Sequence, residues 1–288
     1  MQITQNYALR FLTTRFGIPS LLRTTLLISS IVFCAITLSA APTWAQESKT
    51  FVIGTTVGDF ADMVKESLKP LLEKKGFEVK LVQFTDYVQP NIALSEKSLD
   101  ANLFQHRPYL EEFSKAKGLK LSPLSQVPTA PLGLYAGKKK SLAEVSDGVT
   151  VAVPNDPTNL ARALRIIADL GWIELPQKSA EIQVTPRDIT KNVKNVKIIQ
   201  LEAAQLPRAT RDVDYAIING NYAVSSGLAL TSALAQEKSD AYVNWIVVRT
   251  EDVSSAKATA LKDAASSPEF KKYAREKFKG YKFPAAWK

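Results

Sequence analysis

The chain is poor in the residue types that thiol, metal and nucleotide chemistry need most. Its 288 residues include one cysteine, Cys34, and one histidine, His106. A single cysteine cannot form a disulfide within the chain, and no cluster of Asp or Glu accompanies His106 to complete a zinc site. The GxGxxG and P-loop patterns and the GxSxG elbow are also missing. We therefore expect a binding protein without cofactor or metal, and not an enzyme.

Acidic residues are absent from residues 1–45, where arginines precede an apolar run at 26–40. Small residues then flank Trp44, which predicts a signal peptide that ends at Ala45. The alternative is an uncleaved membrane anchor. Cys34 follows Phe33 inside the apolar run, whereas a lipoprotein cysteine would end such a run after a small residue. We expect a periplasmic, freely diffusing protein without a lipid anchor.

A large excess of positive charge is also missing once the signal peptide is set aside. The formal net charge of +9 falls to +6 when its three arginines are removed. The densest basic cluster, residues 138–140, follows a glycine and lacks the interleaved aromatics of single-strand binders. We therefore expect that the protein does not bind nucleic acid. We also expect it to be a monomer.

What the chain does contain is an alternation of apolar strand-like runs and helical stretches. The expected strands are at 50–56, 77–84, 100–106, 131–137, 148–154, 196–202, 214–220 and 242–249. With helices between them, this order predicts parallel sheets covered by helices, and an α/β fold of two lobes. We expect the first lobe at 46–133 plus 248–288, with a helical tail packed on it, and the second lobe at 134–247.

Two of the expected helices have clear end signals. The helix at 59–76 has Asp59 as its candidate N-cap, and Pro70 inside it predicts a kink. The helix after Asp156 has that residue as its cap and Pro157 at its first position. Gly171 ends this second helix.

Aromatic residues follow two of the predicted strands. Phe104, His106 and Tyr109 follow one, and Tyr87 follows the preceding strand. Ligands of open α/β sheets bind beyond the carboxyl ends of the strands. These residues therefore form a candidate pocket wall for an apolar or thioether side chain. The alternative is that they are ordinary core aromatics.

Polar residues occupy the equivalent places in the second half of the chain. Asn159 and Arg162 lie in the first turns of a helix, where an anion is favoured and Arg can grip a carboxylate. Asn219 ends a hydrophobic strand and offers both a donor and an acceptor. Arg162 could instead be solvated or bridge the lobes. Asn219 could instead form an Asn-Gly turn. Asn221 fits a turn or cap residue better, so it is a second-rank candidate for ligand binding.

Five segments of the chain resemble signature segments of the NlpA/MetQ family of methionine-binding proteins. They occur in the family's order: FTDYVQPNIAL (84–94), DANLFQHRPYL (100–110), VAVPNDPTNLARAL (151–164), LEAAQLPRA (201–209) and YAIINGNYA (215–223). The resemblance implies a two-lobed periplasmic binding protein fold, type II-like, with the ligand in the cleft between the lobes. It implies delivery of methionine to an ABC importer, made of a permease and an ATPase.

The resemblance also assigns roles to the candidate residues. Tyr87, Phe104, His106 and Tyr109 would line the side-chain pocket. Asn159 and Arg162 would bind the carboxylate, and Asn219 the amino-acid head group. The family's members are usually lipoproteins, from which the position of Cys34 departs. The turn at 54–60 also differs, so no contact near Asp59 is carried over.

Three other functions stay open at this point. One is a binding protein for another small solute, such as a methionine-containing dipeptide, another amino acid or an organic anion. The second is a secreted enzyme on the same fold, and the third is a nucleic-acid or adhesion role that uses the positive charge.

Overall fold

The computed structural model describes residues 49–177 and 183–287. These residues belong to one compact unit, Glu47–Lys288. The expected signal segment at 1–45, with Cys34, lies outside the described residues. Within the described ranges, no helix is long and apolar enough to cross a bilayer.

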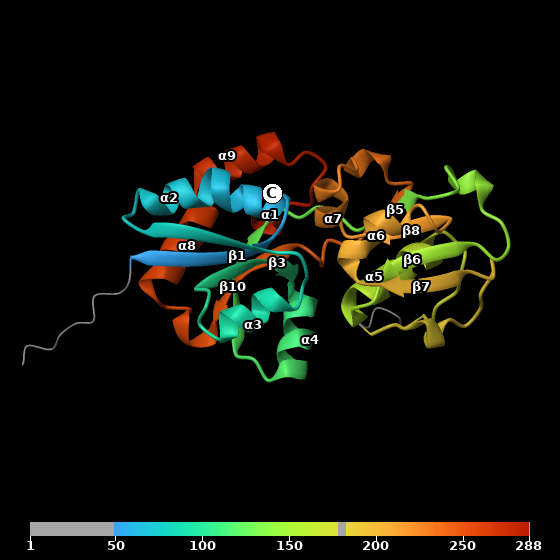
Figure 1. The fold of residues 1–288 in the computed structure, drawn as a ribbon, viewed down its shortest axis with the longest axis horizontal. Helices are drawn as coiled ribbons and strands as arrows, with labels where there is room; N and C mark the ends of the chain where they lie inside the picture. Colours follow the sequence, from blue (N-terminus) through green and yellow to red (C-terminus); the bar gives the residue numbers. More distant parts are fainter. Residues whose placement is uncertain (1–48, 178–182, 288) are drawn as a thin grey trace, which may run out of the picture. The chain divides into compact units, whose positions relative to one another are not determined.

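The first sheet contains five strands in the order β2-β1-β3-β10-β4 (Figure 1). They are β1 (Thr50–Thr56), β2 (Glu78–Phe84), β3 (Ala101–His106), β4 (Leu121–Val127) and β10 (Asn244–Arg249). The expected parallel pairing holds for β1 with β2 and β3. It is wrong for β10, which runs antiparallel to both β3 and β4. We did not expect β4.

The second sheet has the order β7-β6-β8-β5-β9. Its strands are β5 (Gly133–Ala136), β6 (Thr150–Pro154), β7 (Lys197–Leu201), β8 (Tyr215–Ile218) and β9 (Ala235–Gln236). β6 pairs in parallel with β7 and β8, whereas β5 is antiparallel to β8 and β9. β8 is buried along its whole length, which explains its unbroken apolar sequence.

The chain passes between the two sheets twice, at residues 128–132 and 237–243. The first passage ends at residue 132, next to the lobe boundary at 133/134 that the sequence predicts, and the lobe bounds stay predictions. The second lies earlier than the predicted return at 248, because β10 already belongs to the first sheet from Asn244. The run at 242–249 has the pattern of one continuous strand, and nothing in that pattern shows which sheet it joins.

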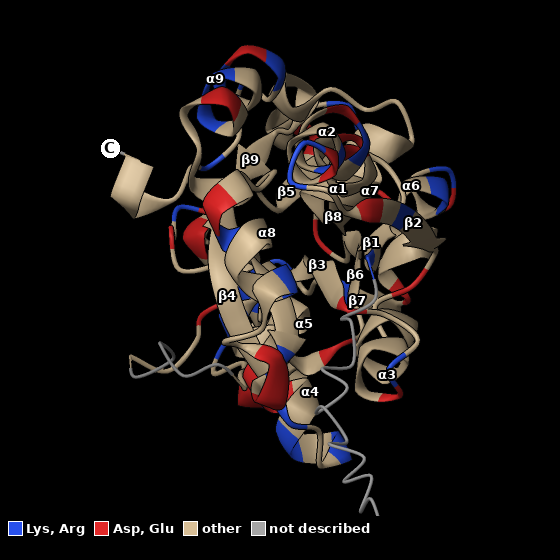
Figure 2. Cartoon of the chain, turned by 90° about the vertical axis from the view of Figure 1, so that its left-hand side faces the viewer, with Lys and Arg blue, Asp and Glu red and all other residues tan. Residues whose placement is uncertain are grey.

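Helices cover both sheets. In the first half of the chain they are α1 (Asp59–Met63), α2 (Lys69–Glu73), α3 (Gln89–Ser95) and α4 (Arg107–Lys117). In the second half they are α5 (Pro157–Asp169), α6 (Leu206–Ala209), α7 (Gly220–Ser225), α8 (Ala256–Ser266) and α9 (Pro268–Lys277). Short 3-10 turns lie at Leu142–Glu144, Pro186–Asp188, Ala203–Gln205, Leu230–Ser232, Thr250–Asp252 and Ala285–Trp287. In Figure 2, basic and acidic residues are interspersed along these helices, so no single-sign stripe appears in this view.

The helical tail packs on the first sheet, as expected. Leu261 of α8 and Phe270 of α9 share one hydrophobic core with Phe51 of β1. Figure 1 shows both helices beside that sheet. Ser267 separates the two helices and caps α9 by accepting a hydrogen bond from the Phe270 N–H, and Pro268 is the first residue of α9.

The first helix is interrupted, as Pro70 predicts. A π-helical turn, Val64–Leu68, separates α1 from α2, so the backbone widens just before the residue that cannot donate a hydrogen bond. The prediction of Asp59 as the N-cap is wrong, because Gly58 holds that position with φ of 95°. Asp59 is the first helical residue instead. Its buried carboxyl accepts hydrogen bonds from the Tyr281 hydroxyl and the Phe60 N–H.

Burial raises the pKa of Asp59 to about 7, against the opposing effect of its hydrogen bond with Tyr281. The folded protein therefore binds this proton more tightly than the unfolded chain does. The stabilisation that results is fully present below the unfolded pKa of 3.8, and it is lost as pH rises through about 7.

We expect Asp59→Asn, which mimics the protonated carboxyl, to be more stable than wild type at pH 8.5, by up to about 4 kcal/mol. At pH 4 the two proteins should be nearly equal. Urea unfolding at both pH values measures the difference. An equal difference at both pH values would contradict the assigned pKa.

Candidate functional site

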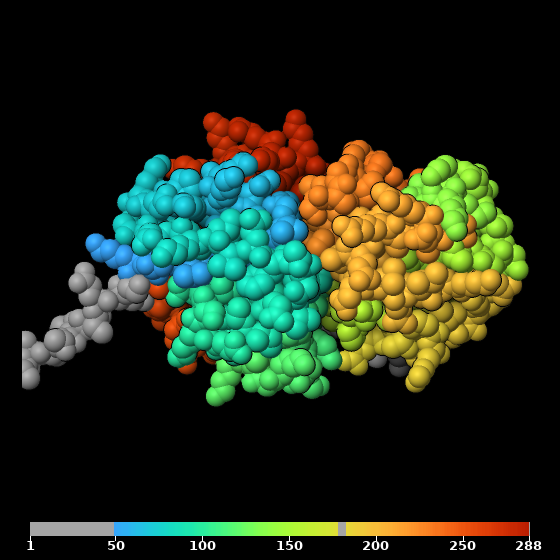
Figure 3. Space-filling model, viewed as in Figure 1, coloured from blue at the N-terminus to red at the C-terminus, as the bar shows by residue number. Residues whose placement is uncertain are grey.

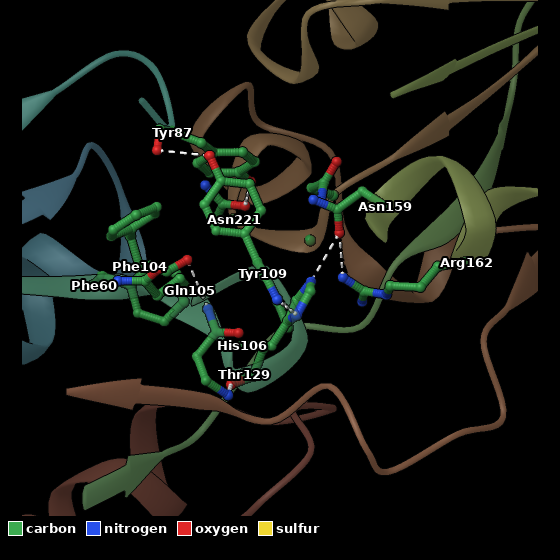
Figure 4. A pocket seen from close by; sticks show the side chains of 14 residues that line it. Phe60, Tyr87, Phe104, Gln105, His106, Tyr109, Thr129, Asn159, Arg162 and Asn221 are labelled. Carbon is green, nitrogen blue, oxygen red and sulfur yellow. Dashed lines mark hydrogen bonds between the residues drawn. The ribbon is translucent and has the colours of Figure 1, made fainter. Parts of the chain in front are cut away.

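The predicted site residues come together around one cavity. Fourteen residues from both halves of the fold line it, and they leave a cavity of about 20 Å³ between them (Figure 4). They are Phe60, Tyr87, Phe104, Gln105, His106, Tyr109, Thr129, Ala130, Asn159, Arg162, Asn219, Gly220, Asn221 and Asn244. A cavity of this size has room for about one water molecule, so the two sides must separate before a small solute can enter. All the candidates from the sequence, including Asn221, are in this set.

The aromatic candidates form one continuous wall. Tyr87 stacks on Phe104 with ring centres 5.8 Å apart, and Tyr109 meets both rings edge-on. The Tyr109 hydroxyl donates to the backbone oxygen of Tyr87 at 2.8 Å, which fixes the two rings relative to each other. Phe104 and His106 lie at the end of β3, and α4 begins directly after His106. This end of the strand lies at the cavity. The wall presents ring faces and edges that suit an apolar side chain.

His106 is buried, and both of its ring nitrogens are engaged. Nδ1 accepts a hydrogen bond from the Tyr109 N–H, so the histidine is the N-cap of α4. Nε2 lies 3.1 Å from Asn159 Oδ1, which already accepts from Arg162 Nη1 at 2.6 Å. An oxygen cannot donate, so Nε2 carries the proton and the ring is neutral.

The charge state of His106 agrees with this geometry. Burial, with a contribution from the Arg162 charge, lowers the pKa of His106 to about 3. The ring therefore stays neutral at physiological pH. With neither nitrogen free to take a proton, this geometry favours a structural role for His106 over that of a general base.

Arg162 is held by α5. Asp156 caps this helix, as predicted, by accepting a hydrogen bond from the Asn159 N–H. The Arg162 guanidinium is buried, with 5% of its surface exposed, and it is paired with the carboxylate of Glu237. Nε donates to Glu237 Oε2 at 2.8 Å, and Nη2 donates to Oε1 at 2.5 Å. The guanidinium also stacks on the Tyr242 ring at 4.4 Å.

The Arg162 charge persists despite its burial. Desolvation alone would lower the pKa of this guanidinium, but the attraction of the Glu237 carboxylate raises it above its ordinary value. Of the alternatives that the sequence left open, solvation is wrong. The structure places a permanent positive charge at one end of the cavity.

The two candidate asparagines differ in what they contact. Asn221 Oδ1 accepts a hydrogen bond from the Tyr87 hydroxyl at 2.6 Å, so this amide ties α7 to the first sheet's side of the cavity. Asn219 is the N-cap of α7, and its side chain does not cap the helix. Its buried Oδ1 has no hydrogen-bond partner among the described residues. Such an atom costs free energy unless a ligand or water satisfies it.

Several residues at or beside the cavity were not among the candidates from the sequence. Glu237 lies in a polar stretch, AQEKSD, that has the pattern of a solvated loop. Gln105 sits on a strand between two predicted site residues, and its amide bonds with those of Asn91 and Asn102 in a buried network. Asn244 donates to the Phe104 backbone oxygen at 2.9 Å. Burial of amides on a strand is the only signal that could have found the last two.

Hydrogen bonds join the two sides of the cavity. His106 meets Asn159, Tyr87 meets Asn221, and the Tyr222 hydroxyl donates to the Thr85 backbone oxygen at 3.0 Å. In Figure 3 the atoms coloured for residues near 85–110 adjoin those coloured for residues near 200–230, and the cavity cannot be seen from this side. The structure is therefore a closed form, and a ligand could enter only after these bonds break.

The chemistry of the cavity suits a small zwitterion. A fixed cation, an unpaired amide oxygen and an aromatic wall can take a carboxylate, an ammonium and an apolar side chain respectively. Among residues 49–177 and 183–287, no group of three or more His, Cys, Asp or Glu side chains could hold a metal.

Comparisons of sequence identify close relatives. The chain is 36% identical over 268 residues to the probable D-methionine-binding lipoprotein MetQ of Vibrio cholerae. The match covers 92% of this chain and 97% of that protein. It is 39% identical over 232 residues to the D-methionine-binding lipoprotein MetQ of Escherichia coli K12, with 79% and 85% covered. These lipoprotein names oppose our expectation that the chain has no lipid anchor.

Solved structures share the fold. A nutrient-binding protein from Burkholderia cenocepacia bound to methionine matches with a TM-score of 0.75 and 40% identity, over 80% of this chain and 97% of that one. A crystal structure of the methionine-binding protein MetQ matches with a TM-score of 0.76 and 39% identity, over 81% and 96%. The family model of the NlpA lipoproteins matches residues 51–286. The chain therefore belongs to the NlpA lipoprotein family.

Proposed function

We propose that this protein captures methionine in the cavity between its two sheets and delivers it to an ABC importer. The observation that carries the proposal is the buried, unpaired Oδ1 of Asn219 in a cavity that also contains the Arg162 guanidinium. The names of the relatives and of the methionine-bound structure support the choice of ligand.

The binding mode follows from pairing each part of the ligand. The carboxylate takes a free guanidinium N–H of Arg162, which has five donors and uses three of them on Glu237 and Asn159. The ammonium donates to Asn219 Oδ1. The thioether packs against the wall of Tyr87, Phe104 and Tyr109, where sulfur is favoured near ring edges. His106 contributes a neutral wall that holds Asn159 in place.

Closure and delivery follow from the same contacts. A ligand that touches Arg162 on one side and Phe104 on the other binds the closed form more strongly than an open one, and shifts the population towards it. The importer would distinguish the loaded protein by this closed shape. The chain would act as a carrier and not as an enzyme.

We propose that it works outside the cytoplasm. The signal-like segment at 1–45 and the lipoprotein names of the relatives both support this location. The position of Cys34 supports a freely diffusing protein, whereas those names support an anchored one.

The proposed function is tested by thermal unfolding of residues 46–288 with single amino acids, both enantiomers of methionine and Gly-Met. We expect methionine to raise the melting temperature, because a ligand that binds only the folded state stabilises it by mass action. If only Gly-Met or another solute raised the melting temperature, the protein would still be a binding protein, but its ligand would not be methionine. Unfolding and refolding beforehand removes any ligand that co-purifies.

We expect Asn219→Ala to weaken methionine binding by about 10-fold to 100-fold, since a hydrogen bond to a charged group contributes roughly 1.5–3 kcal/mol. The empty protein should keep its stability, because Asn219 Oδ1 has no protein partner to lose. Asn221→Ala is the matched control. It removes the bond to Tyr87 and should lower stability as well as affinity. Calorimetry and urea unfolding measure both quantities, and equal behaviour of the two variants would contradict the assignment of Asn219.

We expect Arg162→Ala to lose methionine binding by about 3 kcal/mol or more, because the ligand carboxylate is left buried without a partner. This change also leaves the buried Glu237 carboxylate without its ion-pair partner. The double variant Arg162→Ala with Glu237→Gln is therefore the control for folding. The double variant should recover stability and still fail to bind. Wild-type affinity in it would place the carboxylate elsewhere.

A further inference from the structure

We propose that Glu237 determines the charge class of the ligand: by neutralising Arg162 it makes the cavity select a zwitterion over an anion with the same side chain. This inference rests on the proposed function and assigns a role to a residue outside the cavity lining. Glu237 lies behind Arg162, on the side of a second hollow that both residues and Tyr242 share.

The Glu237 carboxylate is fixed by more than the arginine. Oε1 also accepts a hydrogen bond from the Leu132 N–H at 3.0 Å, and the backbone of Glu237 donates to the Leu132 oxygen. Its side chain is 6% exposed. Because both oxygens have buried donors, the carboxylate cannot turn away from Arg162 when a ligand arrives.

The ion pair of Arg162 and Glu237 has no net charge before a ligand binds. Arg162 is the only charged residue among the described residues that line the cavity, and no carboxylate lines it. His106 is neutral, as its hydrogen bonds require. Asp156 is a second buried acid that the Arg162 charge influences, and its carboxylate accepts hydrogen bonds from the Thr158 hydroxyl and from the backbone and side-chain N–H groups of Asn159. Among the described residues, Glu237 is the only one that forms an ion pair with Arg162.

This balance favours one kind of ligand. A zwitterion brings a carboxylate to Arg162 and an ammonium to neutral acceptors such as Asn219, so the enclosed charge stays zero. An anion that lacks the ammonium leaves one uncompensated negative charge next to the Glu237 carboxylate. An unpaired charge is costly in a site shielded from water. The zwitterion is thus preferred without any acidic residue in contact with its ammonium.

Removal of the Glu237 charge should reverse the preference. Glu237→Gln keeps the size of the side chain and an oxygen for Arg162, but leaves the site with a net positive charge. The α-hydroxy acid analogue of methionine, an anion of nearly the same shape, then supplies the missing negative charge. If Glu237 were only a structural support, its loss would weaken both ligands by the same factor.

The test is calorimetry of wild type, Glu237→Gln and Glu237→Asp with methionine and with its α-hydroxy acid analogue. The quantity compared is the ratio of the two dissociation constants, anion over zwitterion. We expect this ratio to fall at least about tenfold in Glu237→Gln, a change of about 1.4 kcal/mol. It should stay within about threefold of wild type in Glu237→Asp, which retains the charge. An unchanged ratio in Glu237→Gln would overturn the inference.

The outcomes separate the two proposals. If wild type binds methionine and the ratio is the same in every variant, only the role of Glu237 fails. If wild type binds neither ligand, the proposed function fails and the role of Glu237 falls with it. If Glu237→Gln does not fold, Glu237→Ala, which also removes the charge, decides: a tenfold fall in the ratio supports the inference, and a ratio kept near wild type contradicts it.

Discussion

The burial of one guanidinium is the constraint on which the site depends. Arg162 lies on a helix packed against the second sheet, and a buried cation is tolerated only when its donors are paired. One group of donors meets Glu237, and another meets Asn159. Asn159 then requires the proton of His106 on Nε2, which leaves Nδ1 to cap α4. The charge on one lobe thereby determines the tautomer of a histidine on the other.

The topology explains why these groups meet. β3 and β8 both end at the cavity, and each continues directly into a helix, α4 or α7. The residues at those ends, His106 and Asn219, are therefore presented by rigid elements, so a ligand meets side chains that are already oriented. The aromatic wall gains the same rigidity from the bond between the Tyr109 hydroxyl and the Tyr87 backbone.

Local patterns in the sequence predicted most of the helix caps, helix interruptions and strand ends. The cap at Asp156, the interruption at Pro70 and the strand ends at His106 and Asn219 all follow from residue types that act on their own neighbours. Glu237 could not be predicted in this way, because its partner Arg162 is 75 residues away along the chain. The antiparallel placement of β10 was missed for the same reason, since strand order depends on which edge is open when the segment arrives.

The position of β10 has a consequence for how the chain acquires its structure. This strand lies between β3 and β4, and among the described strands β4 pairs with β10 alone. All of the second sheet precedes β10 in the chain. During synthesis from the N-terminal end, the first sheet therefore cannot be completed early. β4 has no strand partner until the last sixth of the polypeptide is available. Such long-range pairing slows folding and exposes a strand edge to association, so the order of strands favours a chain that stays unfolded until it is complete.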